Sequence, residues 1–422
     1  MAKKKLLFFS IFIIIILVFV LTIYNIIYKN NNIYLNNKDE APNFISIMLE
    51  ETASSGEYKV SKSNKWPSKG YVFNKEMSYC NYGSTLTWNE NDNSVSVNIN
   101  KTDKCYVYFD IYVPTLVEYV KSQYTGTQGE NGLYYHDSTL ANGAGDNSYR
   151  YAGASDSVNN YICLGSDTTT CPDANLFRII GVFGDKTKVI RAKSVGNQKW
   201  HTSESNTWSS SSLNAYLNGT YLTSLGTIAE KIATTTWKVG GCSWSNIKTS
   251  VPKIVYKNEV GSSASTTTVD KKIGLMYISD YYYSASSSAW TLVGYNKSDA
   301  TKDYSAAKTI NWLYLGSKEW TISRVSDETF SAFIVDGSGH VFSYNVNFSD
   351  FAVRPSFNLD STVTYVSGDG TKSNPIRINW LTDSFEKTPV KPGQNGVKSL
   401  TYVERITSFF VLWCGYNRCK YG

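Results

Sequence analysis

The most hydrophobic stretch of the chain lies near its beginning. Residues 6–27 are apolar except for Ser10, Thr22, Tyr24 and Asn25, and three lysines precede them. A helix over this stretch would be about 33 Å long, close to the hydrocarbon thickness of a bilayer. A cleaved signal peptide usually has a shorter apolar region and a small-residue cleavage site, which is missing here. The pattern therefore favours an uncleaved signal-anchor over a cleaved signal, with the N-terminus cytoplasmic and the body outside the cell.

Two segments of different character follow the apolar stretch. Residues 29–65 are rich in Asn, Lys, Ser and Glu and are typical of a solvated spacer, with a helix expected near residues 44–51. Residues 66–113 alternate in the manner of a small β module. Its strands are expected at residues 71–73, 84–88, 95–99 and 105–113. The acidic turn at 89–93 is interpreted as turn chemistry, in preference to a calcium loop, because it lacks the spacing of an EF-hand.

The remaining chain contains a short helix, a connection and one large domain. A helix is expected at 114–124, followed by an irregular connection rich in Gly, Asn and Tyr. In the large domain, helices are expected at 211–217, after a serine run that offers an N-cap, and at 228–234. The strands of that domain are expected at 177–183, 187–192, 273–278, 330–335, 340–344 and 363–366. The predicted order is a signal-anchor (1–28), a spacer (29–65), a β module (66–113), a helix with connection (114–160), a mixed domain (161–379) and a basic irregular tail (380–422).

Composition and charge support a β-rich α+β protein and exclude one class of partner. Aromatic residues make up 14% of the chain and charged residues 18%, a balance that favours strands over a helical bundle. The net charge is +6, and three of these charges come from the lysines at positions 3–5. The other three come from residues 381–422, so the body is neutral. A neutral body lacks the basic surface of a nucleic-acid-binding protein.

The cysteines agree with export. Cys80 and Cys105 flank a hairpin-like region, and Cys163 and Cys171 flank a short loop. Neither pair has the C-x-x-C spacing of a zinc site, and the chain has only three histidines. Two local disulfides are the simplest interpretation in an oxidising compartment. Cys242 is expected to be a buried thiol, and no metal site is predicted.

Catalytic and cofactor motifs are not found. The chain has no phosphate-binding glycine loop, no H-E-x-x-H and no G-x-S-x-G, and no cofactor is predicted. His136, His201 and His340 are far apart, and His340 is expected at the surface because it follows a tight turn. Arg324 and Arg354 are flanked by apolar or aromatic residues. In a domain with few charges, such arginines usually make buried structural hydrogen bonds.

Aromatic clusters provide the candidates for ligand binding. These are Tyr281, Tyr282 and Tyr283, together with Trp290 and Tyr344. Tyrosine and tryptophan supply large contact areas at a low cost in side-chain entropy, as binding surfaces require. Packing in the core or at its rim is the favoured interpretation of Tyr281–Tyr283, and it is the alternative for Trp290 and Tyr344.

Three stretches resemble an uncharacterised domain family. They are residues 175–183 (NLFRIIGVF), residues 208–221 (WSSSSLNAYLNGTY), and residues 320–324 (WTISR) with 353–359 (VRPSFNL) and 368–371 (GDGT). The family occurs in surface proteins of Gram-positive, Firmicutes-type bacteria. It is distantly similar to the C-type-lectin-like fold of formylglycine-generating, sulfatase-modifying enzymes. The resemblance covers about residues 161–379 and implies a C-type-lectin-like mixed domain there.

This part of the sequence lacks the cysteine pattern that the enzymes of this fold need for catalysis. Formylglycine-generating enzymes use a C-x-x-x-x-C copper-binding pair inside the domain, whereas here that spacing occurs only at Cys414 and Cys419, beyond it. The resemblance therefore implies the fold without the oxidase site. The expected function is non-enzymatic binding or adhesion at the cell surface, with an extracellular glycan, peptide or protein as partner and the membrane contacted through residues 6–27. An extracellular enzyme or a structural spacer are the alternatives.

Overall fold

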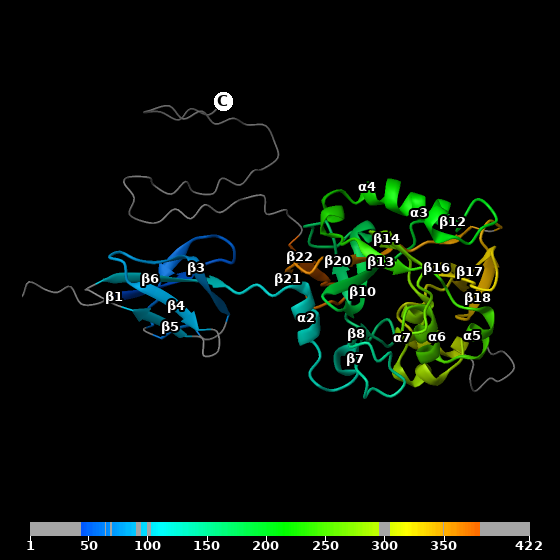
Figure 1. Cartoon of the computed structure of the whole chain (residues 1–422), viewed down its shortest axis with the longest axis horizontal. Coiled ribbons are helices and arrows are strands. Elements are labelled where there is room, and N and C mark those ends of the chain that lie inside the picture. The colour runs from blue at the N-terminus through cyan, green and yellow to red at the C-terminus, as the bar shows by residue number, and fades with distance from the viewer. Residues whose placement is uncertain are drawn as a thin grey trace, which may run out of the picture. The chain divides into compact units, whose positions relative to one another are not determined.

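The computed structural model describes two compact units. It covers residues 44–63, 65–67, 70–89, 94–98, 103–294, 304–348 and 350–379, and the units divide between Tyr112 and Val113 (Figure 1). The predicted anchor, residues 29–43 of the predicted spacer and the predicted basic tail, which includes Cys414 and Cys419, lie outside these residues. Within the described ranges, no helix combines the length and the apolar character needed to cross a membrane. The described chain is β-rich with mixed sheets and a few short helices.

The N-terminal unit packs a hairpin against a four-stranded sheet. The sheet order is β2-β1-β6-β3, with β1 parallel to β6, and β4 pairs with β5. Ile47, Val107 and Phe109 form its buried core, and Phe73 stacks on Trp88 at 5.3 Å between ring centroids. The strands are β1 (Phe44–Glu50), β2 (Tyr58–Val60), β3 (Tyr71–Cys80), β4 (Thr85–Asn89), β5 (Ser94–Asn98) and β6 (Lys104–Ile111).

The helix predicted near residues 44–51 is wrong, because this segment is strand β1. Its residues pair in register with β6 from Phe44 to Leu49 and also with β2. Ile45, Ile47 and Leu49 alternate along the strand, and Ile47 joins the core beside Val107. The β module therefore begins at the start of the described chain, within what was expected to be spacer.

The C-terminal unit contains two main sheets. The larger has the order β15-β20-β11-β10-β9-β22-β21, with β8 also pairing with β10 and with β7. The second has the order β12-β19-β16-β17-β18, and β13 pairs with β14. The larger sheet consists of β7 (Leu133–His136), β8 (Ser148–Tyr151), β9 (Tyr161–Cys163), β10 (Leu176–Phe183), β11 (Lys186–Arg191), β15 (Ile273–Gly274), β20 (Ser356–Leu359), β21 (Tyr365–Ser367) and β22 (Ile376–Ile378). The other strands are β12 (Asn197–Gln198), β13 (Thr235–Lys238), β14 (Thr268–Lys271), β16 (Glu319–Arg324), β17 (Ser331–Val335), β18 (Val341–Asn345) and β19 (Phe351–Ala352).

The helices of this unit are short and depend on local caps. Thr115 and Glu118 form a capping box at the start of α2, and Ser211 accepts a hydrogen bond from the backbone of Asn214 at the start of α3. Both helices lie where the sequence predicts them. The α-helices are α2 (Leu116–Ser122), α3 (Ser212–Tyr216), α4 (Leu222–Ser224), α5 (Trp244–Thr249), α6 (Pro252–Glu259) and α7 (Ile278–Tyr283). A π-helix spans Leu217–Tyr221, and 3₁₀-helices span Glu130–Gly132, Asp173–Asn175, Trp208–Ser210, Gly226–Lys231, Ser287–Thr291 and Tyr304–Ile310.

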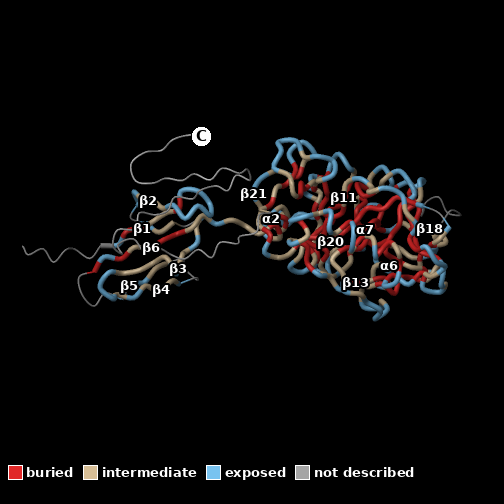
Figure 2. The backbone as a smooth tube through the Cα atoms, turned by 90° about the horizontal axis from the view of Figure 1, so that it is seen from above, coloured by how far each residue is buried: buried red, intermediate tan, exposed pale blue. Residues whose placement is uncertain are grey.

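Three segments of this unit differ from the sequence prediction. The helix expected at 228–234 is a 3₁₀-helix that ends at Lys231, and Ile232 already forms a β-bridge to Leu359. The expected irregular connection at 125–160 contains β7 and β8, and β8 pairs with β10 in the larger sheet. The strand expected at 273–278 stops at Gly274, where an added Cβ would meet the ring of Trp237 at 2.9 Å. Helix α7 begins four residues later. Figure 2 shows the buried backbone running through β11, β20 and α7, along the main hydrophobic core.

Candidate functional site

Both predicted disulfides are present. Cys80 at the end of β3 is bonded to Cys105, which lies directly opposite it in β6. Cys163 at the end of β9 is bonded to Cys171, eight residues later. Cys242 is the free cysteine of the described residues and is buried as predicted, and its burial raises the pKa of the thiol. Each unit therefore has its own disulfide, and the one described thiol is shielded from solvent.

Four of the five predicted ligand-binding aromatics are not at the surface. The surface position expected for Tyr281, Tyr282, Tyr283 and Trp290 is wrong, because each side chain is at most 1% exposed. All six residues of α7 are buried, and the hydroxyl of Tyr281 donates to the carbonyl of Gly339 at 2.9 Å. Packing in the core, the favoured interpretation of Tyr281–Tyr283 and the alternative for Trp290, is confirmed for these four residues.

Tyr344 is the remaining aromatic candidate and is partly exposed. It lies in β18, packs edge-on against Phe351 with ring centroids 4.9 Å apart, and has the ammonium of Lys318 at 4.7 Å from its ring centroid. It does not lie with the other four candidates in a common surface. A single tyrosine already covered on one edge offers little area for a ligand.

The structural role predicted for both arginines agrees with the structure. Arg354 is 3% exposed and binds Glu319 through two hydrogen bonds of 2.6 and 2.7 Å, while it also donates to the carbonyl of Leu313. Arg324 donates to the carbonyl of Gly240 at 3.1 Å. Burial raises the pKa of Glu319, although the neighbouring guanidinium opposes this effect. The bidentate pair is the kind of charge contact that tolerates burial.

Further buried charges of the C-terminal unit also hold elements together. The ammonium of Lys188 in β11 lies 2.5 Å from the carboxylate of Asp280 in α7, and burial lowers the pKa of Lys188. Glu259 at the end of α6 accepts hydrogen bonds from the backbone N–H groups of Ile278 and Ser279, both at 2.9 Å. Burial raises the pKa of Glu259. These groups connect α6 and α7 to the sheet and are shielded from any substrate in solution.

The histidines do not meet in a shared site. His136 and His201 are 0% and 9% exposed. The surface position predicted for His340 is wrong, because its side chain is 7% exposed. The turn before it is held against the core by the bond from Tyr281 to Gly339.

One buried cluster was missed by sequence reasoning. The Nδ1 atom of His136 accepts a hydrogen bond from the backbone of Ala144 at 3.1 Å. Beside it, Arg150 lies 2.6 Å from Asp146, and the hydroxyl of Tyr256 donates to the same carboxylate. Tyr256 lies 110 positions from Asp146, so no spacing in the sequence could reveal that it joins the other residues of this cluster.

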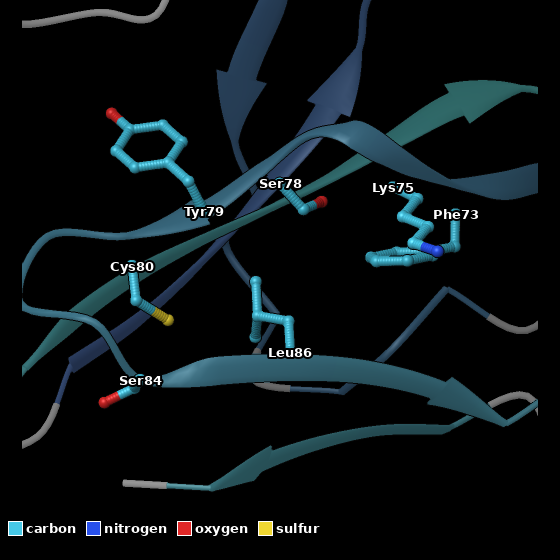
Figure 3. A pocket seen from close by; sticks show the side chains of 7 residues that line it. All are labelled: Phe73, Lys75, Ser78, Tyr79, Cys80, Ser84 and Leu86. Atoms are coloured by element: carbon cyan, nitrogen blue, oxygen red, sulfur yellow. The ribbon is translucent and has the colours of Figure 1, made fainter. Parts of the chain in front are cut away.

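A pocket opens in the N-terminal unit between β3 and β4. Its volume is about 230 Å³. Phe73 and Lys75 lie at one end, Cys80 and Ser84 lie at the other, and Leu86 lies on the side of β4 (Figure 3). The complete lining is Phe73, Lys75, Ser78, Tyr79, Cys80, Ser84 and Leu86.

The polar side chains that line this pocket differ in whether they already have a hydrogen-bond or ion-pair partner. The hydroxyl of Ser78 donates to the carbonyl of Asn74 at 2.6 Å and accepts from a backbone N–H of β6 at 3.0 Å. The hydroxyl of Ser84 bonds to Asp103. Lys75 is exposed, and it makes no ion pair within the part of the chain that the structure describes. A mixed lining that contains Phe73, Leu86 and one ammonium without an ion-pair partner among the described residues suits a ligand that has both an apolar and an anionic part.

Three residues next to this pocket have ligand atoms close enough for a metal, but they already serve a structural role. Atoms of Cys80, Asp103 and Cys105 lie within 4.8 Å of one another, but the two sulfurs are bonded to each other and no thiolate is left for a metal. Desolvation opposes ionisation of Asp103, but hydrogen bonds from Ser84 and Tyr82 outweigh it and lower its pKa to about 2. The carboxylate thus fixes the turn between β3 and β4.

Comparison with known proteins gives one match. No curated protein matches the chain, and no solved structure matches it. The matching segment begins in the turn between β10 and β11 and ends just after β20, so it covers much of the C-terminal unit and excludes the pocket. Residues 184–361 match the model of DUF6273, a domain of unknown function.

Proposed function

We propose that this chain is a non-enzymatic binding protein displayed outside a cell membrane, and that its N-terminal unit binds an apolar group carrying a carboxylate. The observation that carries the proposal is the pocket between β3 and β4, which Lys75 lines together with Phe73 and Leu86 and where its ammonium has no carboxylate partner among the described residues. The buried ions of the C-terminal unit contrast with it, because Lys188 and Arg354 are held in internal ion pairs and Glu259 is held by internal hydrogen bonds.

The proposed location rests on two features. Residues 6–27 have the length and flanking charge of a signal-anchor, and disulfides such as the two found here persist in oxidising compartments. Protease added to intact cells should therefore degrade residues 44–379 without lysis. Full protection of these residues, with degradation only after lysis, would contradict the location.

The fold and origin proposed for the large domain rest on the sequence resemblance. The stretches at 175–183, 208–221 and 353–359 support a C-type-lectin-like domain of the kind found in surface proteins of Firmicutes-type bacteria. A β-rich mixed fold with short helices is compatible with that proposal. The fold alone does not assign a ligand.

The ligand class follows from the lining of the pocket. Phe73, Leu86 and the disulfide of Cys80 provide apolar contact, and a volume of about 230 Å³ suits one side-chain-sized group. The ammonium of Lys75 attracts an anion at the rim, and hydrogen bonds to charged groups contribute about 1.5–3 kcal/mol. A peptide end with an apolar last residue has both properties.

The test is a titration of the full-length chain with N-acetyl-L-phenylalanine and with its amide. We expect the carboxylate form to bind and the amide to bind roughly 10-fold more weakly or worse, because it lacks the anion. Replacement of Lys75 (Lys75→Met) keeps the apolar stem and removes the charge. This variant should weaken binding of the carboxylate by about 10- to 100-fold and leave binding of the amide unchanged.

Lys62→Met is the matched control, because Lys62 is an exposed lysine of the same unit that does not line the pocket. It should bind as the wild type does. Equal binding by the Lys75 and Lys62 variants would refute the assigned role of Lys75. If neither the carboxylate probe nor its amide binds, the structural-spacer alternative is favoured.

A further inference from the structure

We propose that the loop at residues 137–147 is an acid-sensitive cover over a buried aromatic cluster, and that His136 is the latch that holds it closed at neutral pH. The proposal concerns the C-terminal unit and is independent of the pocket in the N-terminal unit. It rests on the contacts that hold the loop and on the chemistry of the histidine beneath it.

Hydrogen bonds and an ion pair attach the loop to the rest of the unit. The hydroxyl of Tyr283 donates to the carbonyl of Asn142 at 3.1 Å. Asp146 accepts a hydrogen bond from the hydroxyl of Tyr256 at 2.8 Å and pairs with Arg150 at 2.6 Å. The backbone N–H of Ala144 donates to Nδ1 of His136 at 3.1 Å. Among these contacts, the bond to the imidazole involves the group that can change charge under mild acid.

The loop covers aromatic side chains that lie apart from the main core. Ala152, Tyr283 and Trp290 form a separate buried cluster, and Leu140 and Ala144 of the loop pack against it. The ring centroid of His136 lies 4.8 Å from that of Tyr283 and 5.0 Å from that of Trp290. Opening of the loop would therefore expose two large aromatic side chains that are buried in the closed form.

The hydrogen bond fixes the protonation state of the latch. Because Nδ1 of His136 accepts a bond, the neutral ring carries its proton on Nε2, which is buried and has no hydrogen-bond partner among the described residues. A second proton must go to Nδ1, where it would face the N–H of Ala144 and replace attraction by repulsion. It would also place a cation in a fully buried position near Arg150.

The surrounding charges favour the neutral ring. Burial and the nearby guanidinium of Arg150 in β8 lower the pKa of His136 well below its usual value, and only Asp146 opposes them. Desolvation works against the ionised form of Asp146, but Arg150 and the hydrogen bonds from Ser148 and Tyr256 together outweigh it and lower the pKa of that carboxyl. Burial raises the pKa of both Tyr256 in α6 and Tyr283 in α7.

Asp137, which follows the histidine, also stays ionised in mild acid, because hydrogen bonds from Thr139 lower its pKa. Between about pH 4 and 7, His136 is therefore the group of this cluster that gains a proton when the loop opens. The closed form binds this proton more weakly than the open form, in which the imidazole regains its usual pKa of about 6.5. The closed loop is stable above that pH, and its opening constant rises up to about tenfold per pH unit as the pH falls below it.

The test is hydrogen exchange of the full-length chain at pH 7.0, 6.0 and 5.0, with rates corrected for the intrinsic effect of pH on exchange. Peptides covering residues 137–147 should show an opening constant that rises toward about tenfold per unit below pH 6.5. Peptides covering β10 and β11 should keep constant protection and serve as the internal control. Loop protection that is the same at all three pH values would overturn the proposal.

Two variants separate the latch from general stability. His136→Asn offers a side-chain oxygen near the position of Nδ1 but cannot take up a proton, so its loop should open to the same extent at pH 7.0 and 5.0. Tyr283→Phe removes the bond to Asn142 and should raise opening at every pH while it keeps the slope. An undiminished pH slope in His136→Asn would refute the role of His136, and the wild-type profile decides the question if that variant does not fold.

Discussion

Glu319 and Arg354 illustrate how single residues control the stability of the C-terminal unit. The two side chains are 1% and 3% exposed, so each charge relies on the other in place of water. The surface pair of Lys193 and Asp173 has side chains that are 62% and 60% exposed, and water can replace either partner there. Burial therefore decides what the loss of one partner costs.

Glu319→Gln should destabilise the C-terminal unit by about 3–5 kcal/mol, because it leaves the guanidinium of Arg354 buried without a counter-charge. Urea unfolding of the full-length chain, followed by tryptophan fluorescence, measures the change. Asp173→Asn is the matched control and should change the free energy of unfolding by no more than about 1 kcal/mol. Comparable losses in the two variants would contradict the assigned role of the buried pair.

At the scale of elements, success of the sequence prediction depended on whether the deciding contact was local. Helix α3 was predicted correctly because its cap, Ser211, stands directly before it. Strand β1 was mistaken for a helix because its partner β6 is about 60 residues away, and the apolar positions of a short segment fit both periods. The strand expected at 273–278 ends at Gly274, which lies against Trp237, and this contact cannot be recognised from the sequence.

The candidate residues show the same limit. The disulfides were predictable because each closes a short loop with an evident partner. Packing of Tyr281–Tyr283 in the core was favoured but could not be settled from the sequence, since the contacts of α7 include Lys188 and Gly339, which are distant in sequence. The pocket was also unforeseen. Asn74 bonds to the backbone of Met77 and to the hydroxyl of Ser78, in a break of register that accompanies the exposed position of Lys75.

At the scale of the whole molecule, the two units use their polar groups differently. In the C-terminal unit, buried charged side chains hold neighbouring elements together, and each has a partner inside the protein. These side chains are Lys188, Glu259 and Arg354. In the N-terminal unit, a disulfide and Asp103 fix the turn beside a pocket whose lysine is uncommitted among the described residues. Under the proposed function, the C-terminal unit is a rigid scaffold and the N-terminal unit captures the ligand.

The most direct test of ligand capture is a hydrogen-exchange footprint of the full-length chain with and without saturating N-acetyl-L-phenylalanine at pH 7. The account predicts slower exchange in peptides covering β3 and β4, no change in those covering α7 and β18, and loss of the footprint in Lys75→Met. Protection centred on Tyr344 in β18, or a footprint at β3 and β4 that persists in Lys75→Met, would contradict it.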